Sequence, residues 1–352
     1  MSFYNGKISV SFFGESHSSH IGLTIHNFPH GKKLNIDRIN EDLQLRHSFV
    51  NGKSTRTEAD QFEIISGYFN GYTTGAPLTF IIKNNDIRSS DYEKNAGIIR
   101  PSHGDYALFK KFEGFHDYRG GGHYSGRLTS LFIILGSICK TELEKKNIKI
   151  YSRIKSISDI EDNSLFNGDN LDLSFPVVSS DIKENMINFI DNLKDNSTGG
   201  VIETKIENLP IGLGDPIFSG VESVISSLVF SIPGVKGIEF GAGFAISKML
   251  GSKANDQMEI LNDKVQFLSN NSGGISSGIT NGEEVIFRTA IKPTPTIGLP
   301  QKTINILKNE NITTVYGGRH DKCIVPKVVH VINAVTYFAV YLLMVCEGAW
   351  ID

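Results

Sequence analysis

The sequence has few cysteines and no motif that pairs them. Cys139, Cys323 and Cys346 are widely separated in the 352-residue chain and show no Cys-x-x-Cys spacing. Disulfide frameworks and zinc sites are built from paired, closely spaced thiols. The pattern therefore argues against both, and we expect no metal site.

The sequence also lacks a long apolar run. No stretch approaches the roughly 20 apolar residues that a membrane span needs. The longest candidate, residues 331–346, is interrupted by Asn333 and Thr336 and predicts a buried helix. Residues 1–20 lack the basic region and following apolar region of a signal peptide. We therefore expect a cytoplasmic protein with no membrane segment.

Neither sign of charge dominates. Lys and Arg together number 35, against 38 for Asp and Glu, which gives a formal charge of −3. Nucleic-acid-binding domains usually carry a basic excess, so this balance argues against nucleic acid as the main partner. A near-neutral protein can still hold a strongly positive cleft, and arginines clustered in a few motifs predict one here.

Hydrophobic periodicity predicts a mixed fold. Alternating apolar residues predict strands at residues 7–13, 21–25, 61–82 (two or three strands), 148–157, 200–209, 235–240, 242–246 and 284–291. Helical spacing predicts helices from Asn35 or Asp37 to Arg46, and over residues 128–145, 181–193, 221–230 and 328–344. Residues 47–60 predict a polar loop. No fixed-period repeat is present, so we expect one α+β domain, residues 1–352, with a two-layer or sandwich core.

Residues 100–129 concentrate groups that bind anions. Arg100, His103, Arg119 and Arg127 fall within this stretch, together with His116 and His123. The triple glycine at 120–122 lets backbone N–H groups approach a ligand closely, and the apolar run behind it predicts a helix. This combination favours a phosphate or another anion. The structural alternative is a tight turn that leads into a buried helix.

Ser16 and His17 follow a predicted strand and suggest two functions. The pair could belong to a Ser-His hydrolase, but neighbours on a strand point to opposite faces and rarely act on each other. We therefore favour His17 alone, facing a cleft as an acid or an anion contact.

Two later motifs add to a predicted ligand site. A Gly/Ser-rich segment at 271–278 and the Lys-Pro-Thr-Pro-Thr segment at 292–296 predict the wall of a cofactor site. In the Gly-Gly-Arg-His-Asp segment at 317–321, Arg319 could hold a carboxylate or phosphate. Asp321 could be a base, an N-cap or a salt-bridge partner, and its position alone favours capping.

Eight motifs occur in order along the chain: Phe13-Gly14-Glu15-Ser16-His17, Arg88-Ser89-Ser90-Asp91-Tyr92, Arg100-Pro101-Ser102-His103-Gly104-Asp105-Tyr106, Asp117-Tyr118-Arg119-Gly120-Gly121-Gly122, Val235-Lys236-Gly237-Ile238-Glu239, Gly273-Gly274-Ile275, Lys292-Pro293-Thr294 and Gly318-Arg319-His320-Asp321. Through them the chain resembles the chorismate synthase family over nearly its whole length. The resemblance implies a homotetramer with a β-α-β sandwich fold. It also implies conversion of 5-enolpyruvylshikimate 3-phosphate to chorismate and phosphate by a 1,4-anti elimination that needs reduced FMN.

The resemblance also assigns roles to residues. It places His17 near the substrate phosphate, makes His103 the group that protonates reduced flavin, and places Asp321 near flavin N5, where it assists removal of the C6 proton. It implies substrate contacts at Ser16, Arg46, Arg100, Arg127 and Arg319. It implies cofactor contacts at His123, Tyr124, Ser125, Asn255, Ser277, Lys292, Pro293, Thr294, Pro295, Thr296 and Arg319.

The chain departs from the family pattern at several positions. Ser18 and Ser277 replace glycines, the segment at 123–128 has lost an arginine at His123, and the loop at 45–51 has lost others. The lost arginines leave less positive charge where the flavin and substrate phosphates are expected. A second hypothesis is therefore a flavin- or anion-binding homologue with weak or no turnover. If His17 and His103 act in protonated form, the rate should fall as pH rises through the histidine range, around 6.5 or above.

The source of reducing power stays open. NADPH is one candidate reductant, and an external flavin reductase is the other. The chain has no Gly-x-Gly-x-x-Gly dinucleotide fingerprint, which favours the external source.

Overall fold

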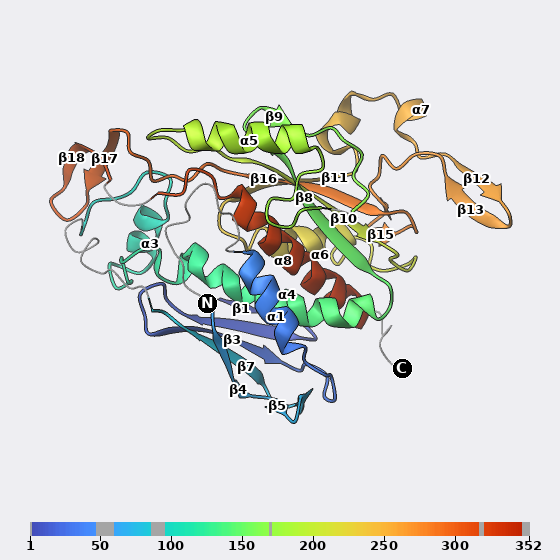
Figure 1. The fold of residues 1–352 in the computed structure, drawn as a ribbon, viewed down its shortest axis with the longest axis horizontal. Coiled ribbons are helices and arrows are strands. Elements are labelled where there is room, and N and C mark those ends of the chain that lie inside the picture. Colours follow the sequence, from blue (N-terminus) through green and yellow to red (C-terminus); the bar gives the residue numbers. More distant parts are fainter. Residues whose placement is uncertain (1, 47–59, 86–95, 169–170, 317–319, 347–352) are drawn as a thin grey trace.

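Two five-stranded antiparallel sheets enclose a layer of helices (Figure 1). The structure is a computed structural model that describes residues 2–46, 60–85, 96–168, 171–316 and 320–346. This arrangement confirms the predicted α+β class and the β-α-β sandwich.

The first sheet is built from the N-terminal quarter of the chain, in the order β1-β2-β3-β7-β4. Its core-facing residues alternate along β3, where Ile21, Leu23 and Ile25 are fully buried. Between them, Gly22 leaves room for the Phe13 ring on the opposite face. The strands are β1 Phe3–Tyr4, β2 Ser9–Gly14, β3 His20–His26, β7 Leu78–Lys83 and β4 Phe62–Ser66.

The second sheet comes from the middle of the chain, in the order β11-β16-β10-β8-β9. A buried ion pair crosses its inner strands, because Arg153 donates to the Glu203 carboxylate at 2.7 Å. The strands are β11 Val235–Phe240, β16 Val285–Ile291, β10 Gly200–Glu207, β8 Lys149–Ile157 and β9 Ile160–Glu161.

Two long apolar helices, α4 (Thr129–Glu144) and α8 (Val325–Cys346), form the centre of the sandwich. They approach closely, because a Cβ on Gly136 would lie 2.4 Å from the Ala334 carbonyl oxygen. By length and composition α8 could cross a membrane, but 83% of its most apolar stretch is buried inside the fold. It is therefore the core helix that the sequence predicts for residues 331–346.

The remaining helices lie around this core. Asn35 caps α1, as one of the two predicted caps, by accepting a hydrogen bond from the Arg38 N–H at 3.1 Å. The helices are α1 Ile36–Leu45, α3 Asp105–Lys111, α5 Ser180–Asn192, α6 Val221–Val229 and α7 Gly251–Ala254, with 3₁₀ turns η1 Gly122–Tyr124, η2 Gly126–Leu128 and η3 Gly243–Lys248.

The described residues also form four two-stranded hairpins. The hairpins β12–β13 and β17–β18, which the sequence analysis did not predict, lie at opposite ends of the molecule (Figure 1). The hairpins are β5 Tyr68–Phe69 with β6 Tyr72–Thr73, β12 Met258–Leu261 with β13 Lys264–Phe267, β14 Ile275–Ser276 with β15 Ile279–Thr280, and β17 Gln301–Asn305 with β18 Glu310–Thr314.

The strand predicted at residues 242–246 is wrong, because this segment is part of η3. Gly241 and Gly243 both adopt positive φ, which turns the chain out of β11. The Glu239 carboxylate accepts the Phe244 N–H at 3.0 Å and stabilises the turn. The alternating apolar residues that suggested a strand are exposed here instead of buried.

Candidate active site

Ser16 and His17 lie in a tight turn after β2, and their side chains face each other. The Ser16 Oγ and His17 Nδ1 are 3.0 Å apart, and both residues are buried. The prediction that these neighbours point to opposite faces is wrong. The strand ends at Gly14, and the Ser18 N–H closes a turn onto the Glu15 carbonyl, so side chains no longer alternate.

The triple-glycine loop packs directly on this turn. The Ser16 N–H donates to the Gly122 carbonyl at 3.1 Å. Gly120 has φ +62°, and a Cβ on it would lie 2.7 Å from His17 Cε1 and 2.8 Å from Ser16 Oγ. The absent side chain at Gly120 therefore admits His17, a role that the sequence analysis did not predict.

Arg100 ties the loop to α3. Its guanidinium donates to both oxygens of Asp105, at 2.8 and 2.7 Å, and also to the Gly120 carbonyl. Burial raises the pKa of Asp105, but the hydrogen bonds and charge of Arg100 outweigh that effect and lower it. Arg119, the other arginine near the loop, is held by Asp117 at 2.8 Å. Both arginines thus already have carboxylate partners.

His103 lies against the 292–296 segment. Its Nε2 is 2.7 Å from the Thr296 Oγ1, and the Lys292 Nζ donates to the Ser102 carbonyl at 2.7 Å. Burial, followed by the charge of Arg100, lowers the pKa of His103 to about 4, although Asp105 opposes the shift. His103 is therefore neutral at pH 7 in the absence of a ligand.

The 292–296 segment offers groups suited to an anionic cofactor. Burial and the neighbouring Lys236 lower the pKa of Lys292, because two ammonium groups share this region. Thr294 Oγ1 is buried and has no hydrogen-bond partner among the described residues, while the Thr294 carbonyl accepts from Ser197 Oγ at 2.6 Å. Pro293 and Pro295 alternate with these threonines. A buried hydroxyl without a partner among the described residues, two positions from Lys292, fits a cofactor that carries a phosphate and polar ring atoms, as FMN does.

Arg46 and Arg127 share one buried carboxylate. The Asp60 side chain is completely buried, and it pairs with Arg127 and, at 3.4 Å, with Arg46. Arg46 also donates to the Gly126 carbonyl at 3.0 Å. The Arg127 Nε donates to the Asn84 Oδ1 at 3.1 Å. Neither Asp60 nor Asn84 belongs to a motif in the sequence, so neither was predicted as a site residue.

His123, Tyr124 and Ser125 continue the same loop. Ser125 caps η2 by accepting the Arg127 N–H at 3.2 Å. The rings of His123 and Tyr124 are 4.0 Å apart, and His123 Nδ1 is 3.8 Å from Glu15 Oε1. These three residues therefore lie close to the Ser16–His17 turn.

Asp321 is an ion-pair partner and not a helix cap. Lys327 Nζ donates to its Oδ1 at 2.9 Å. Capping is wrong because α8 begins at Val325, and the first turn is closed by the Lys327 N–H donating to the Ile324 carbonyl. The neighbouring His320 Nε2 is 2.9 Å from the Tyr316 carbonyl oxygen.

Two predicted cofactor residues lie away from the others. Asn255 follows α7, and Figure 1 shows α7 and α3 at opposite ends of the molecule. Ser277 lies in the β14–β15 turn with φ +56°. Glycine adopts this left-handed conformation most easily, which explains the glycine at this position in the family pattern. Within one chain, no described contact brings Asn255 or Ser277 to His103.

Some predictions fall outside the described residues. These are Arg319, the motif at residues 88–92 and the polar loop at 47–59.

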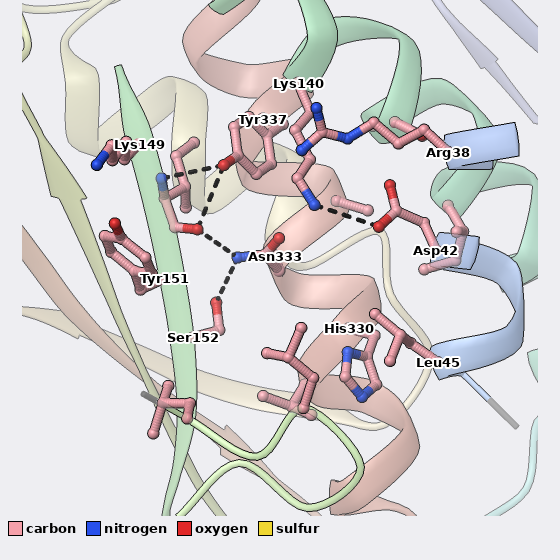
Figure 2. A pocket seen from close by; sticks show the side chains of 18 of the residues that line it. Arg38, Asp42, Leu45, Lys140, Lys149, Tyr151, Ser152, His330, Asn333 and Tyr337 are labelled. Atoms are coloured by element: carbon pink, nitrogen blue, oxygen red, sulfur yellow. Dashed lines mark hydrogen bonds and ion pairs between the residues drawn. The ribbon is translucent and has the colours of Figure 1, made fainter. Parts of the chain in front are cut away.

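A separate cavity of about 560 Å³ lies between α1, α4, α8 and β8 (Figure 2). Lys140 Nζ donates to Asp42 on its wall at 3.2 Å, and the Asn333 amide donates to the Ile150 carbonyl at 3.0 Å. His330 also lines it, and burial lowers the pKa of this histidine to about 4. None of the predicted site residues that the structure describes lines this cavity.

Known proteins resemble the chain along almost all of its length. The chorismate synthase family profile matches residues 8–345. A chorismate synthase from Dehalococcoides mccartyi is 39% identical over 94% of this chain and 93% of the relative. One from Thermococcus gammatolerans is 38% identical over 98% of each chain. A crystal structure of chorismate synthase matches with a TM-score of 0.72 and 25% identity, covering 97% of this chain and 92% of the other. The chain therefore belongs to the chorismate synthase family.

Proposed function

We propose that this chain converts 5-enolpyruvylshikimate 3-phosphate to chorismate and phosphate by a 1,4-anti elimination. The observation that carries the proposal is one connected group of predicted site residues. The Ser16–His17 turn bonds to the triple-glycine loop, and Arg100 joins that loop to the α3 region that carries His103. Arg100 in this group, and Arg127 linked to the turn through Asn84, are the fixed cations that a substrate with carboxylates and a phosphate needs.

The elimination breaks the C6–H bond and the C3–O bond to phosphate. In the net balance a proton leaves C6, two electrons close the new ring double bond, and the electron pair of the C3–O bond leaves with phosphate. We assign His17 to donate a proton or hydrogen bond to the departing phosphate. We assign Asp321, which Lys327 holds at 2.9 Å, to assist removal of the C6 proton.

Reduced FMN is the cofactor that we assign to this reaction, and Lys292, Thr294, Thr296 and His103 would hold it. It would lend one electron to the substrate ring and recover it within the same turnover, so the reaction would be redox-neutral overall. An anion beside His103 offsets the positive potential of Arg100 and Lys292, so the pKa of His103 rises on binding. His103 then takes up a proton that it lacks in the free protein.

A second candidate is a flavin-binding homologue with weak turnover. It is favoured by His123, which stands where the family has an arginine and whose ring lies against Tyr124. Tight binding of reduced FMN without product formation would select this candidate. The Ser-His hydrolase hypothesis predicts labelling of Ser16 by a serine-directed reagent, and we expect no labelling, because the Ser16 O–H also bonds to the Arg119 carbonyl.

We also propose a cytoplasmic homotetramer in which residues 1–352 act as one domain. The described surface supports association, because large apolar side chains of the β12–β13 hairpin are exposed: Met258 61%, Ile260 77% and Val265 65%. In such a tetramer, Asn255 and Ser277 contact a flavin only where they reach the site of a neighbouring copy.

The test is an anaerobic assay of purified protein with chemically reduced FMN and 5-enolpyruvylshikimate 3-phosphate. Chorismate should form, and its absence at saturating flavin would overturn the proposal. Repeating the assay with oxidised FMN and NADPH identifies the reductant. Product without added reductase means intrinsic reduction, and product only after a flavin reductase is added means an external source.

A further inference from the structure

We propose that Asp60 and Asn84 are positioning residues that hold Arg127 and the Ser16–His17 turn in one fixed arrangement. The inference rests on the proposed function of His17 and Arg127. Neither Asp60 nor Asn84 is among the residues that the family resemblance assigns.

Asp60 fixes the end of the Arg127 side chain. The Asp60 side chain is completely buried and that of Arg127 is 6% exposed. A buried carboxylate is strongly unfavourable unless it is paired and hydrogen-bonded, and arginine stays charged under all conditions. Asp60 also pairs with Arg46 at 3.4 Å, but separating it from Arg127 would take the carboxylate away from a buried guanidinium, so the pair restricts the position of the Arg127 side chain.

Asn84 connects Arg127 to the turn that carries His17. Its Oδ1 accepts from Arg127 Nε at 3.1 Å, and its Nδ2 donates to the Glu15 carbonyl at 3.1 Å and to the Ser18 carbonyl at 2.8 Å. Both amide hydrogens and the amide oxygen are thus engaged, which fixes the orientation of the amide. The two carbonyls flank Ser16 and His17, so one side chain spans the turn.

The two positioning residues stand on neighbouring strand ends. Asp60 precedes β4 and Asn84 follows β7, and these strands pair in the first sheet. The Asn84 N–H also donates to the Ser19 carbonyl at 2.9 Å, which continues the sheet contacts into the turn. A rigid sheet edge thereby sets the separation of His17 from Arg127. A misplacement of about 1 Å in such a pair costs about 100-fold in rate.

Isosteric variants separate positioning from mere stability. Asn84→Asp keeps an acceptor for Arg127 but loses the donor to the two turn carbonyls, and it sets a carboxylate against them. Asp60→Asn removes the charge that pairs with Arg127. The double variant Asp60→Asn/Asn84→Asp restores a carboxylate beside Arg127 but not the donor to the turn.

The matched control is Asp162→Asn in the second sheet. Asp162 is fully buried, lies 3.7 Å from Arg153 and accepts the Val178 N–H at 2.9 Å. Its replacement removes a buried charge without touching the candidate active site. The control should lower the melting temperature and leave kcat unchanged.

We expect Asn84→Asp to lower kcat by about 10- to 100-fold, with the substrate KM within about 3-fold of the wild type. The double variant should recover thermal stability relative to Asp60→Asn while its kcat stays low. Recovery of kcat together with stability would overturn the proposal, because the residues would then act through stability alone. A decrease in the kcat of Asn84→Asp no larger than that of Asp162→Asn would also overturn the proposal.

A second measurement works without turnover. In protein labelled with ¹³Cε1-histidine, the His17 signal, assigned by its loss in His17→Gln, should shift in Asn84→Asp and stay in place in Asp162→Asn. An unmoved His17 signal in Asn84→Asp refutes the positioning role even if the wild type proves inactive. A shifted signal in an inactive wild type supports the positioning role and counts only against the proposed function.

Discussion

Gly120 is the position where a single added methyl group would test the site geometry most simply. In Gly120→Ala the new Cβ would lie 2.7 Å from His17 Cε1 and 2.8 Å from Ser16 Oγ. Contacts below 3.0 Å force a shift, and both neighbours are buried, so the turn has to move.

Two effects contribute, and their sizes differ. The left-handed backbone at φ +62° costs an alanine about 1–2 kcal/mol. With an unfolding entropy of about 2.1 cal/mol/K per residue, this corresponds to a decrease in melting temperature of roughly 1–3 °C. The steric effect acts on His17, which has to retreat by roughly 0.7 Å to reach an ordinary contact distance. A retreat of that size lowers kcat roughly 10-fold or more.

Gly126→Ala in the same loop is the control. A Cβ there has no heavy atom within 4 Å, and its φ is not positive. Steady-state kinetics and thermal unfolding of both variants are compared with the wild type. Gly120→Ala should lose activity while retaining most of its stability, and Gly126→Ala should match the wild type in both. Full activity in Gly120→Ala would refute the claim that this glycine admits His17.

Three further predictions concern the cofactor wall, the buried histidine and the last helix. Thr296→Val removes the hydroxyl 2.7 Å from His103 Nε2, so anaerobic titration should show reduced FMN binding about 5-fold more weakly, and an unchanged Kd counts against the contact. His330 has a folded pKa of about 4, below its unfolded value of about 6.5, so the unfolded state binds more protons between these values and stability falls as pH drops through that range. In His330→Gln, the loss of unfolding free energy between pH 7 and pH 5, measured by urea unfolding, should be smaller than in the wild type. An equal loss would contradict the low pKa of His330. Lys327→Met should lower kcat several-fold by freeing Asp321, with less than about 1 kcal/mol lost in stability because the pair is partly exposed, whereas wild-type kcat would argue against that role.

Periodicity predicted the elements that carry the core. The apolar alternation at residues 21–25 corresponds to β3, whose alternate side chains face the core. The helical spacing at 128–145 corresponds to α4, which lies between the two sheets. The segment at 242–246 misled the same reasoning, since Phe244 and Ile246 are exposed in the turn that follows β11 and do not face the core.

The contacts within the site were less predictable. Asp60 and Asn84 meet Arg127 across 67 and 43 positions in the sequence, so no local pattern could reveal them. The Ser16–His17 contact depended on whether a strand continued for three more residues. Arg100 and His103 were recognisable as an anion-binding pair, but the low pKa of His103 follows from its burial and from cations that only the fold brings near.

The central claim is tested most directly by a single-turnover measurement under anaerobic conditions. Enzyme in excess, loaded with reduced FMN, is mixed with 5-enolpyruvylshikimate 3-phosphate, and chorismate and phosphate are quantified after quenching. We expect one chorismate for each phosphate released, and a much slower reaction in His17→Gln with the affinity for FMN unchanged. Saturated flavin with no chorismate formed by the wild type would contradict it.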